Sequence, residues 1–161
     1  QWSSDRNGGF SSANPHQLYL PVIIDPDYHY QSINVESQLR NPHSLLWWMR
    51  RIIGLRQQHP VFGRGDIEVL YPENAKVLAY LRSDENEKVL VVANLSRFAQ
   101  QVNIDLHEHR GYSLIELFGG TDFGAIHEGT VSLSLAPFGF YWFVLVGPSG
   151  ETSALEFTWA S

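Results

Sequence analysis

The most constraining feature of the sequence is the stretch from residue 41 to residue 60, NPHSLLWWMRRIIGLRQQHP, whose apolar residues repeat at helical spacing. Asn41 is a favourable N-cap residue, Pro42 suits the first helical position, and Pro60 ends the element. The apolar side covers roughly half of the circumference, which is wider than the stripe of an ordinary surface helix. It comprises Leu45, Leu46, Trp48, Met49, Ile52, Ile53 and Leu55. We therefore predict a helix that is covered by a large surface.

Arg56 falls in the middle of this apolar side. A guanidinium in such a position needs a carboxylate or carbonyl partner, because a buried charge is costly unless it is paired. The partner has to come from outside the helix. We predict structural roles for Arg56, Trp48 and Ile52.

The sequence after the helix changes to an apolar alternation of period two, which is typical of strands. Turn residues separate the segments, and no helical pattern interrupts them. This order predicts a mainly β fold, an antiparallel β-sandwich preceded by one long helix. The expected strands are residues 67–71, 76–82, 88–95, 100–106, 112–118, 130–135 and 138–146, with a candidate eighth at 154–160. Residues 89–93 are apolar on both faces and should form a central strand.

The first 40 residues lack a clear periodicity and are interrupted by Pro15, Pro21 and Pro26. The same segment contains Trp2, Phe10 and three tyrosines. Aromatic residues favour an ordered loop that lies on a protein surface over a disordered tail. Loops of this length without structure of their own are usually either functional or disordered.

Composition excludes some classes of function. The net charge of −6 argues against nucleic-acid binding, because phosphate contacts need a basic face. No apolar run reaches the ~18 residues of a membrane-spanning helix, and we expect no membrane association. The chain has no cysteine, which fits a cytoplasmic location. It has no recognisable leader peptide and begins with Gln1, so we expect a piece of a longer chain.

Several residues could carry chemistry, but none forms a convincing catalytic set. His107 and His109 supply only two metal ligands in a stretch that leads to a glycine, so a solvated turn is favoured. Glu116 has no second carboxylate partner for glycosidic chemistry. The segment GGTDFG, residues 119–124, does not open a helix and is interpreted as a hairpin connection. Sugar stacking is a hypothesis for Phe140, Tyr141, Trp142 and Trp159, although a core position is favoured.

The order of these elements resembles a known family. The segments QW…DRNGGFS, NVE, SLLWWMRRIIGLRQQHPVFGRGDIEVL, VLVVANLS and LAPFGFYWFVL are similar to the C-terminal portion of family 13 glycoside hydrolases, the α-amylase superfamily. Within it, LYLPVIIDP resembles the trehalose synthases (maltose α-D-glucosyltransferases) more than the oligo-1,6-glucosidases and α-glucosidases. The resemblance covers residues 1 to 146.

The resemblance implies an architecture. Residues 1–40 would be the loop after the last strand of a (β/α)8 barrel, and residues 41–60 the last barrel helix. Residues 61–146 would form the C-terminal β-sandwich domain, and residues 147–161 a tail or an extra edge strand. The catalytic acids of the family belong to barrel strands that would precede residue 1.

The resemblance also implies a function. The parent enzyme would interconvert maltose and trehalose by intramolecular glucosyl transfer, while this chain alone would be inactive and its sandwich would stabilise the barrel. Loops after barrel strands build the active-site face, so Trp2, Arg6 and Asn7 are candidate substrate contacts at its rim. The alternative is that Asp5 and Arg6 pin the loop by a local ion pair.

Two other functions stay open at the level of sequence. One is the C-terminal part of a hydrolytic α-glucosidase or oligo-1,6-glucosidase, and the other is a free-standing carbohydrate-binding module. The expected partner is the upstream barrel of the same protein, and the resemblance also allows a homo-oligomer or a maltokinase. No cofactor is expected.

Overall fold

The structure is a computed structural model that describes residues 1–148. The chain divides into two compact units, Gln1–Gln58 and His59–Ser161, and each is described by itself. Within residues 1–148, no helix is both long and apolar enough to cross a membrane. The candidate eighth strand at 154–160 lies outside the described residues, as does Trp159.

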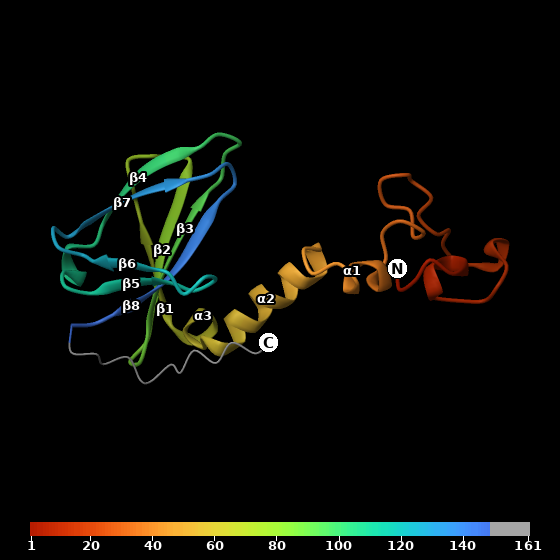
Figure 1. The fold of residues 1–161 in the computed structure, drawn as a ribbon, viewed down its shortest axis with the longest axis horizontal. Coiled ribbons are helices and arrows are strands. Elements are labelled where there is room, and N and C mark those ends of the chain that lie inside the picture. The colour runs from red at the N-terminus through yellow and green to blue at the C-terminus, as the bar shows by residue number, and fades with distance from the viewer. Residues whose placement is uncertain (149–161) are drawn as a thin grey trace. The chain divides into compact units, whose positions relative to one another are not determined.

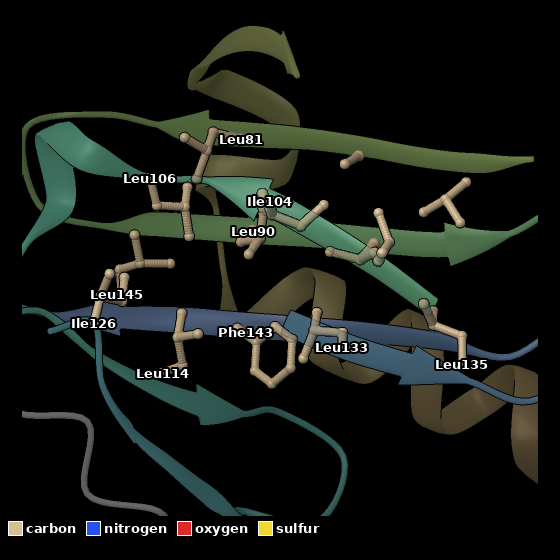
Figure 2. Close-up of a cluster of buried hydrophobic side chains, with 14 residues drawn as sticks. Leu81, Leu90, Ile104, Leu106, Leu114, Ile126, Leu133, Leu135, Phe143 and Leu145 are labelled. Atoms are coloured by element: carbon tan, nitrogen blue, oxygen red, sulfur yellow. The ribbon is translucent and has the colours of Figure 1, made fainter. Parts of the chain in front are cut away.

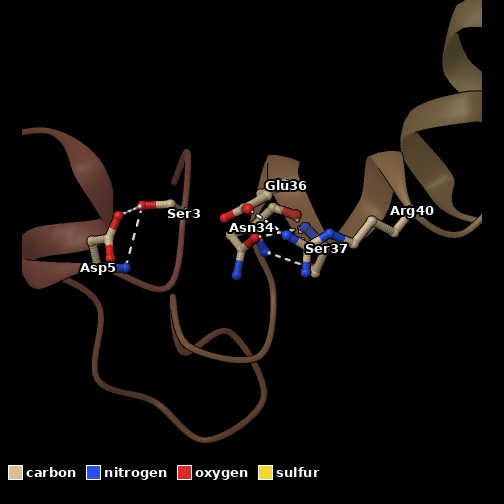
Figure 3. A network of polar contacts seen from close by, with 6 residues as sticks. All are labelled: Ser3, Asp5, Asn34, Glu36, Ser37 and Arg40. Atoms are coloured by element: carbon tan, nitrogen blue, oxygen red, sulfur yellow. Dashed lines mark hydrogen bonds and ion pairs between the residues drawn. The ribbon is translucent and has the colours of Figure 1, made fainter.

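The first unit consists of two 3-10 turns and two helices (Figure 1). They are η1 (Arg6–Gly9), η2 (Pro15–Gln17), α1 (Val35–Leu39) and α2 (Leu45–Gln58). Helix α1 was not predicted. At its start, Asn34 Oδ1 accepts a hydrogen bond from Ser37 N at 2.8 Å, and Asn34 N donates to Ser37 Oγ at 3.4 Å (Figure 3). This reciprocal capping is written in the sequence as Asn34-x-x-Ser37.

Helix α2 begins at Leu45, three residues after the predicted first position Pro42, so the prediction of Asn41 as its N-cap is wrong. Asn41 Oδ1 instead accepts a hydrogen bond from His43 N at 3.0 Å, which forms a turn. The first helical bond runs from Trp48 N to Ser44 O at 3.1 Å. Gln38 Oε1 accepts from Leu46 N at 2.9 Å and satisfies another free donor of the first turn. A side chain from the preceding helix therefore decides where α2 starts.

The apolar side of α2 is largely open to solvent within the described residues. Leu45 is 66% exposed, Trp48 44% and Ile53 49%, while Ile52 is half-buried. Arg56 is exposed and has no ion pair or hydrogen bond inside residues 1–148. Its predicted partner, and the structural roles of Trp48, Ile52 and Arg56, stay predictions.

The second unit is an antiparallel β-sandwich preceded by the short helix α3 (Val61–Arg64) (Figure 1). Its six-stranded sheet has the order β1-β2-β3-β8-β5-β6, and β4 pairs with β7 in a two-stranded sheet. The strands are β1 (Asp66–Leu70), β2 (Val77–Ser83), β3 (Lys88–Asn94), β4 (Gln100–Asp105), β5 (Ser113–Glu116), β6 (Asp122–Ala125), β7 (Thr130–Leu135) and β8 (Phe140–Val146). The predicted fold class is confirmed.

The main core lies between the two sheets (Figure 2). Leu90 and Phe143 of the larger sheet are 0% exposed, and Ile104 of β4 is 1% exposed. These residues alternate with outward-facing neighbours, as a strand with period two requires. The predicted central strand is confirmed, because β3 lies between β2 and β8 and is buried over residues 89–92.

The outer face of the six-stranded sheet is also apolar. Val89, Val91 and Val144 form a second buried cluster there with Val61 of α3 and Leu117. Helix α3 is fastened to β2, because Arg82 Nε donates to Val61 O at 3.2 Å. Towards the edge strand β1, this face is open: the exposed fractions are 58% for Ile67, 42% for Val69 and 40% for Leu78. We call this surface, Ile67, Val69 and Leu78 with their half-buried neighbours Tyr80 and Trp142, the outer apolar face.

The segment at residues 119–124 is partly different from the prediction. It does connect a hairpin, but Asp122–Ala125 forms strand β6 and pairs with β5 through an irregular register. The sequence DFGA has neither alternation nor β-branched residues, so nothing local marks it as a strand. Pairing with β5 is what extends it.

Candidate functional site

Trp2 is held in place by its backbone. Trp2 N donates to Gly8 O at 2.8 Å, and Trp2 O accepts from Glu36 N at 3.0 Å at the start of α1. Gln1 O accepts from Val35 N at 2.9 Å in the same way. The first residues thus satisfy free donors of the α1 N-terminus. The Trp2 ring is 60% exposed and meets the Phe10 ring edge-on, with centroids 6.5 Å apart.

Asn7 is buried and organises the loop around it. It is 3% exposed and has a left-handed backbone with φ of 56°, which asparagine tolerates better than most residues. Its Nδ2 donates to Ser11 O at 2.9 Å and to Ala13 O at 2.8 Å. Both donors are therefore occupied, and the amide closes residues 7–13 into a tight loop.

Arg6 is exposed, and its Nη1 makes one long hydrogen bond of 3.5 Å to Ser12 O. The alternative of a local ion pair between Asp5 and Arg6 is wrong. Asp5 Oδ2 instead accepts from Ser3 Oγ at 3.0 Å (Figure 3). Of the three predicted rim residues, Trp2 and Arg6 present free surface, and Asn7 positions the loop that carries them. Contact of these residues with substrate stays a prediction.

The histidine pair of residues 107–109 is divided between two environments. His107 is exposed and bonded to Asp105, and this contact lowers the pKa of the Asp105 carboxyl. His109 is buried, with its Nε2 3.4 Å from Lys88 Nζ and its ring edge-on to Tyr112. Burial, reinforced by the Lys88 charge, lowers the pKa of His109. The predicted turn is present, but its solvated character holds only for His107.

Glu116 has a structural role. It is 8% exposed, and its two carboxylate oxygens accept from Phe118 N at 2.8 Å and Gly119 N at 2.6 Å. It therefore fixes the turn after β5. Within residues 1–148, no group of three or more His, Cys, Asp or Glu side chains is arranged to hold a metal ion.

Trp142 lies among rings on the outer apolar face. Its centroid is 4.7 Å from that of Phe62 and 5.2 Å from that of Phe118. These tilted ring contacts and the partial burial of Trp142 agree with the favoured packing role over a flat sugar platform. Sequence reasoning recognised the apolar strand at residues 138–146 but missed the outer apolar face. Its signal is that β2 carries apolar residues on both of its faces.

Residues 67–142 match the family described as maltogenic amylase, C-terminal domain. A trehalose synthase from Pimelobacter sp. (strain R48) is 48% identical over 152 residues, which are 92% of this chain and 26% of that protein. An oligo-1,6-glucosidase from Heyndrickxia coagulans is 36% identical over 96 residues, which are 60% of this chain and 16% of that protein.

Solved structures are similar to this chain as well. The isomaltulose synthase from Erwinia rhapontici NX5, whose structure was determined with its natural substrate sucrose, superposes with a TM-score of 0.65 at 27% identity. The match covers 90% of this chain and 24% of that one. This chain therefore spans about a quarter of the length of the trehalose synthase and of the isomaltulose synthase.

Residues 67–142, which lie within the β-sandwich, thus match the maltogenic amylase C-terminal domain family. The chain as a whole is similar to the C-terminal portion of trehalose synthases. The resemblance to the C-terminal portion of the α-amylase superfamily and the resemblance to trehalose synthases within it are both confirmed.

Proposed function

We propose that this chain is the non-catalytic C-terminal part of an enzyme that interconverts maltose and trehalose by intramolecular glucosyl transfer. The observation that carries the proposal is the extent of the match. The similarity to a trehalose synthase covers 92% of the chain, whereas that to an oligo-1,6-glucosidase covers 60%. The additional coverage favours a synthase over a hydrolytic glucosidase.

The chemistry would take place in the upstream barrel. A carboxylate would attack the anomeric carbon of maltose while a second carboxylic acid gives its proton to the departing glucose oxygen. The C1 hydroxyl of that glucose would then displace the first carboxylate and return its proton to the second, which forms trehalose with retention. Exclusion of water from the pocket favours this transfer over hydrolysis. The carboxylates need no cofactor. Glu116, the carboxylate weighed for such chemistry in the sequence, is occupied by its own turn.

The role proposed for the sandwich is to stabilise the barrel. Support comes from the outer apolar face, where Ile67, Val69 and Leu78 are each at least 40% exposed. An antiparallel sheet with one wet face normally carries polar residues there. The occupant we propose is the barrel of the same protein, because the chain spans only a quarter of its relatives and their remaining length can cover such a face.

Product analysis tests the reaction. The full-length enzyme incubated with maltose should yield trehalose as its main product, and the 161-residue chain alone should yield neither trehalose nor glucose. Glucose as the main product would favour the hydrolytic alternative. Turnover of maltose by the chain alone would refute the non-catalytic role.

A substitution on the outer apolar face tests the supporting role. Ile67→Asp would bury a charge at the proposed contact and should lower the free energy of unfolding of the full-length enzyme by at least about 2 kcal/mol. Ser134→Asp is the control, because Ser134 is exposed on β7 of the other sheet. Equal thermal stability of the two variants would show that the outer apolar face stays in water.

A further inference from the structure

A groove of about 590 Å³ opens between the β1–β2 connection and strand β4. All of its lining residues belong to the sandwich unit, and Trp2, Arg6 and Asn7 are not among them. One wall is residues 70–74, the other residues 101–105, and Thr130 closes the end. Its volume is within the range of small-molecule sites, roughly 300–1,000 Å³. We call it the β4 groove.

The β4 wall offers polar side chains at regular spacing. Gln101, Asn103 and Asp105 are exposed and alternate with the buried core residues Val102 and Ile104. Two of the three are already oriented. Asn103 Oδ1 accepts from Ser132 Oγ at 2.7 Å, and Asp105 is bonded to His107. The Gln101 side chain has no partner within residues 1–148. Amide and carboxylate groups are therefore presented to whatever enters.

The opposite wall is fixed rigidly to β4 by Asn74. Its Nδ2 donates to Gln100 Oε1 at 2.9 Å and to Gln101 O at 3.0 Å, and its Oδ1 accepts from Lys76 N at 3.1 Å. The second of these bonds shows that the Gln101 carbonyl points away from β7 and towards the groove. Backbone groups alternate sides along an antiparallel strand. The backbone N–H and C=O of Asn103 and Asp105 therefore face the groove as well.

Tyr71 supplies an apolar surface at the same place. Its side chain is 89% exposed and has no ring contact or hydrogen bond within residues 1–148. It directly follows β1 and is one of the lining residues. An aromatic ring with a free face and a hydroxyl tip suits a ligand that is apolar on one side and polar at its edges. A glucose unit is such a ligand, because its C–H groups form an apolar face and its hydroxyls lie around the edge of the ring.

We propose that the β4 groove binds a chain of α-linked glucose units, with one ring stacked on Tyr71 and the hydroxyls bonded to Gln101, Asn103 and Asp105. The groove's geometry stands independently, while the choice of α-linked glucose rests on the proposed function. An extended peptide fits less well, because peptide strands need apolar sockets for alternate side chains, and the apolar residues Val102 and Ile104 are 3% and 1% exposed.

Affinity electrophoresis of the full-length enzyme tests this proposal, with soluble starch in the native gel as the probe. The wild type should be retarded by starch and not by hydroxyethyl cellulose, a β-linked glucan. Tyr71→Ala should raise the Kd for starch about tenfold, and Gln101→Ala about threefold. Tyr71→Phe keeps the ring and should retain the retardation. Phe98→Ala is the matched control, because Phe98 is 64% exposed on the same unit and lies outside the groove.

Turnover of maltose separates this proposal from the proposed function. Tyr71→Ala should convert maltose at the wild-type rate, since the groove takes no part in the chemistry. Loss of starch retardation at unchanged turnover supports the site. Absence of retardation in the wild type, equal retardation of Tyr71→Ala, or equal retardation by both glucans would each overturn it. Failure to make trehalose would refute only the proposed function.

Discussion

His59 Nδ1 lies 2.5 Å from Glu87 Oε1, and both side chains are almost buried, at 4% and 11% exposure. His59 is the first residue of the sandwich unit, just before α3, whereas Glu87 lies in the β2–β3 hairpin. The pair therefore holds the segment that precedes α3 against the β2–β3 hairpin. Phe62 adds an edge-on ring contact to His59, with centroids 6.4 Å apart.

Glu87→Ala should destabilise the sandwich, because it leaves a ring nitrogen of His59 without its partner in a buried place. We expect a loss of about 1–3 kcal/mol in the free energy of unfolding. Glu85→Ala is the matched control, since Glu85 is exposed in the same hairpin. Chemical denaturation of the full-length enzyme checks both. Equal losses would mean that the contact contributes nothing of its own.

His109 should make the stability of the sandwich depend on pH. Because its pKa in the fold is lowered from the ordinary value of 6.5, the unfolded chain takes up the proton at a higher pH than the folded chain. The contribution of neutral His109 to the stability of the sandwich is therefore present above pH 6.5. It is lost as the pH falls through the lower pKa that His109 has in the folded chain. The Tm difference between wild type and His109→Gln should shrink as the pH falls. His127→Gln, at an exposed histidine, should show no such trend.

Gly129 should resist replacement by alanine for two reasons. Its φ is +78°, and a Cβ there would lie 2.7 Å from His107 Cδ2 and 3.0 Å from Arg110 Nε. Gly124 has a φ of +85° but open space around it, so Gly124→Ala isolates the conformational cost of about 1–2 kcal/mol. Gly129→Ala should cost measurably more in thermal denaturation. Equal losses would show that His107 moves aside freely.

Asn7→Gly should loosen the N-terminal loop while keeping its left-handed backbone. Loss of the two bonds to Ser11 and Ala13 should cost about 1–3 kcal/mol locally, so limited proteolysis should cut the loop faster. Ser4→Gly, at an exposed position, is the control. Weaker maltose turnover with unchanged proteolysis would assign Asn7 a direct contact with substrate instead.

Arg56→Leu should destabilise the intact enzyme if a carboxylate or carbonyl from the barrel covers Arg56. Removing one member of a buried pair typically costs about 3–5 kcal/mol. Arg51→Leu, on the polar side of α2, should leave the Tm nearly unchanged. An unchanged Tm for Arg56→Leu would place that side chain in solvent in the whole protein as it is in this chain.

The sequence by itself determined the fold class and most strand positions, because burial of one face imposes a local period that can be counted. In β7 the alternation Val131-Ser132-Leu133-Ser134-Leu135 is enough to predict that the apolar side chains face the core and the serines face solvent. The end of α2 could also be predicted from the local sequence, because Pro60 cannot continue a helix.

Tertiary structure alone decided features that depend on residues distant in sequence. Helix α2 starts at Leu45, later than predicted, because the Gln38 side chain accepts a hydrogen bond from its first turn. Strand β6 exists because β5 pairs with it, and His109 is buried because β3 brings Lys88 beside it. The β4 groove likewise depends on the packing of β4 against the β1–β2 connection. The physical reason is common to all four: a local pattern encodes which face is apolar, but only the folded chain fixes which partner covers it.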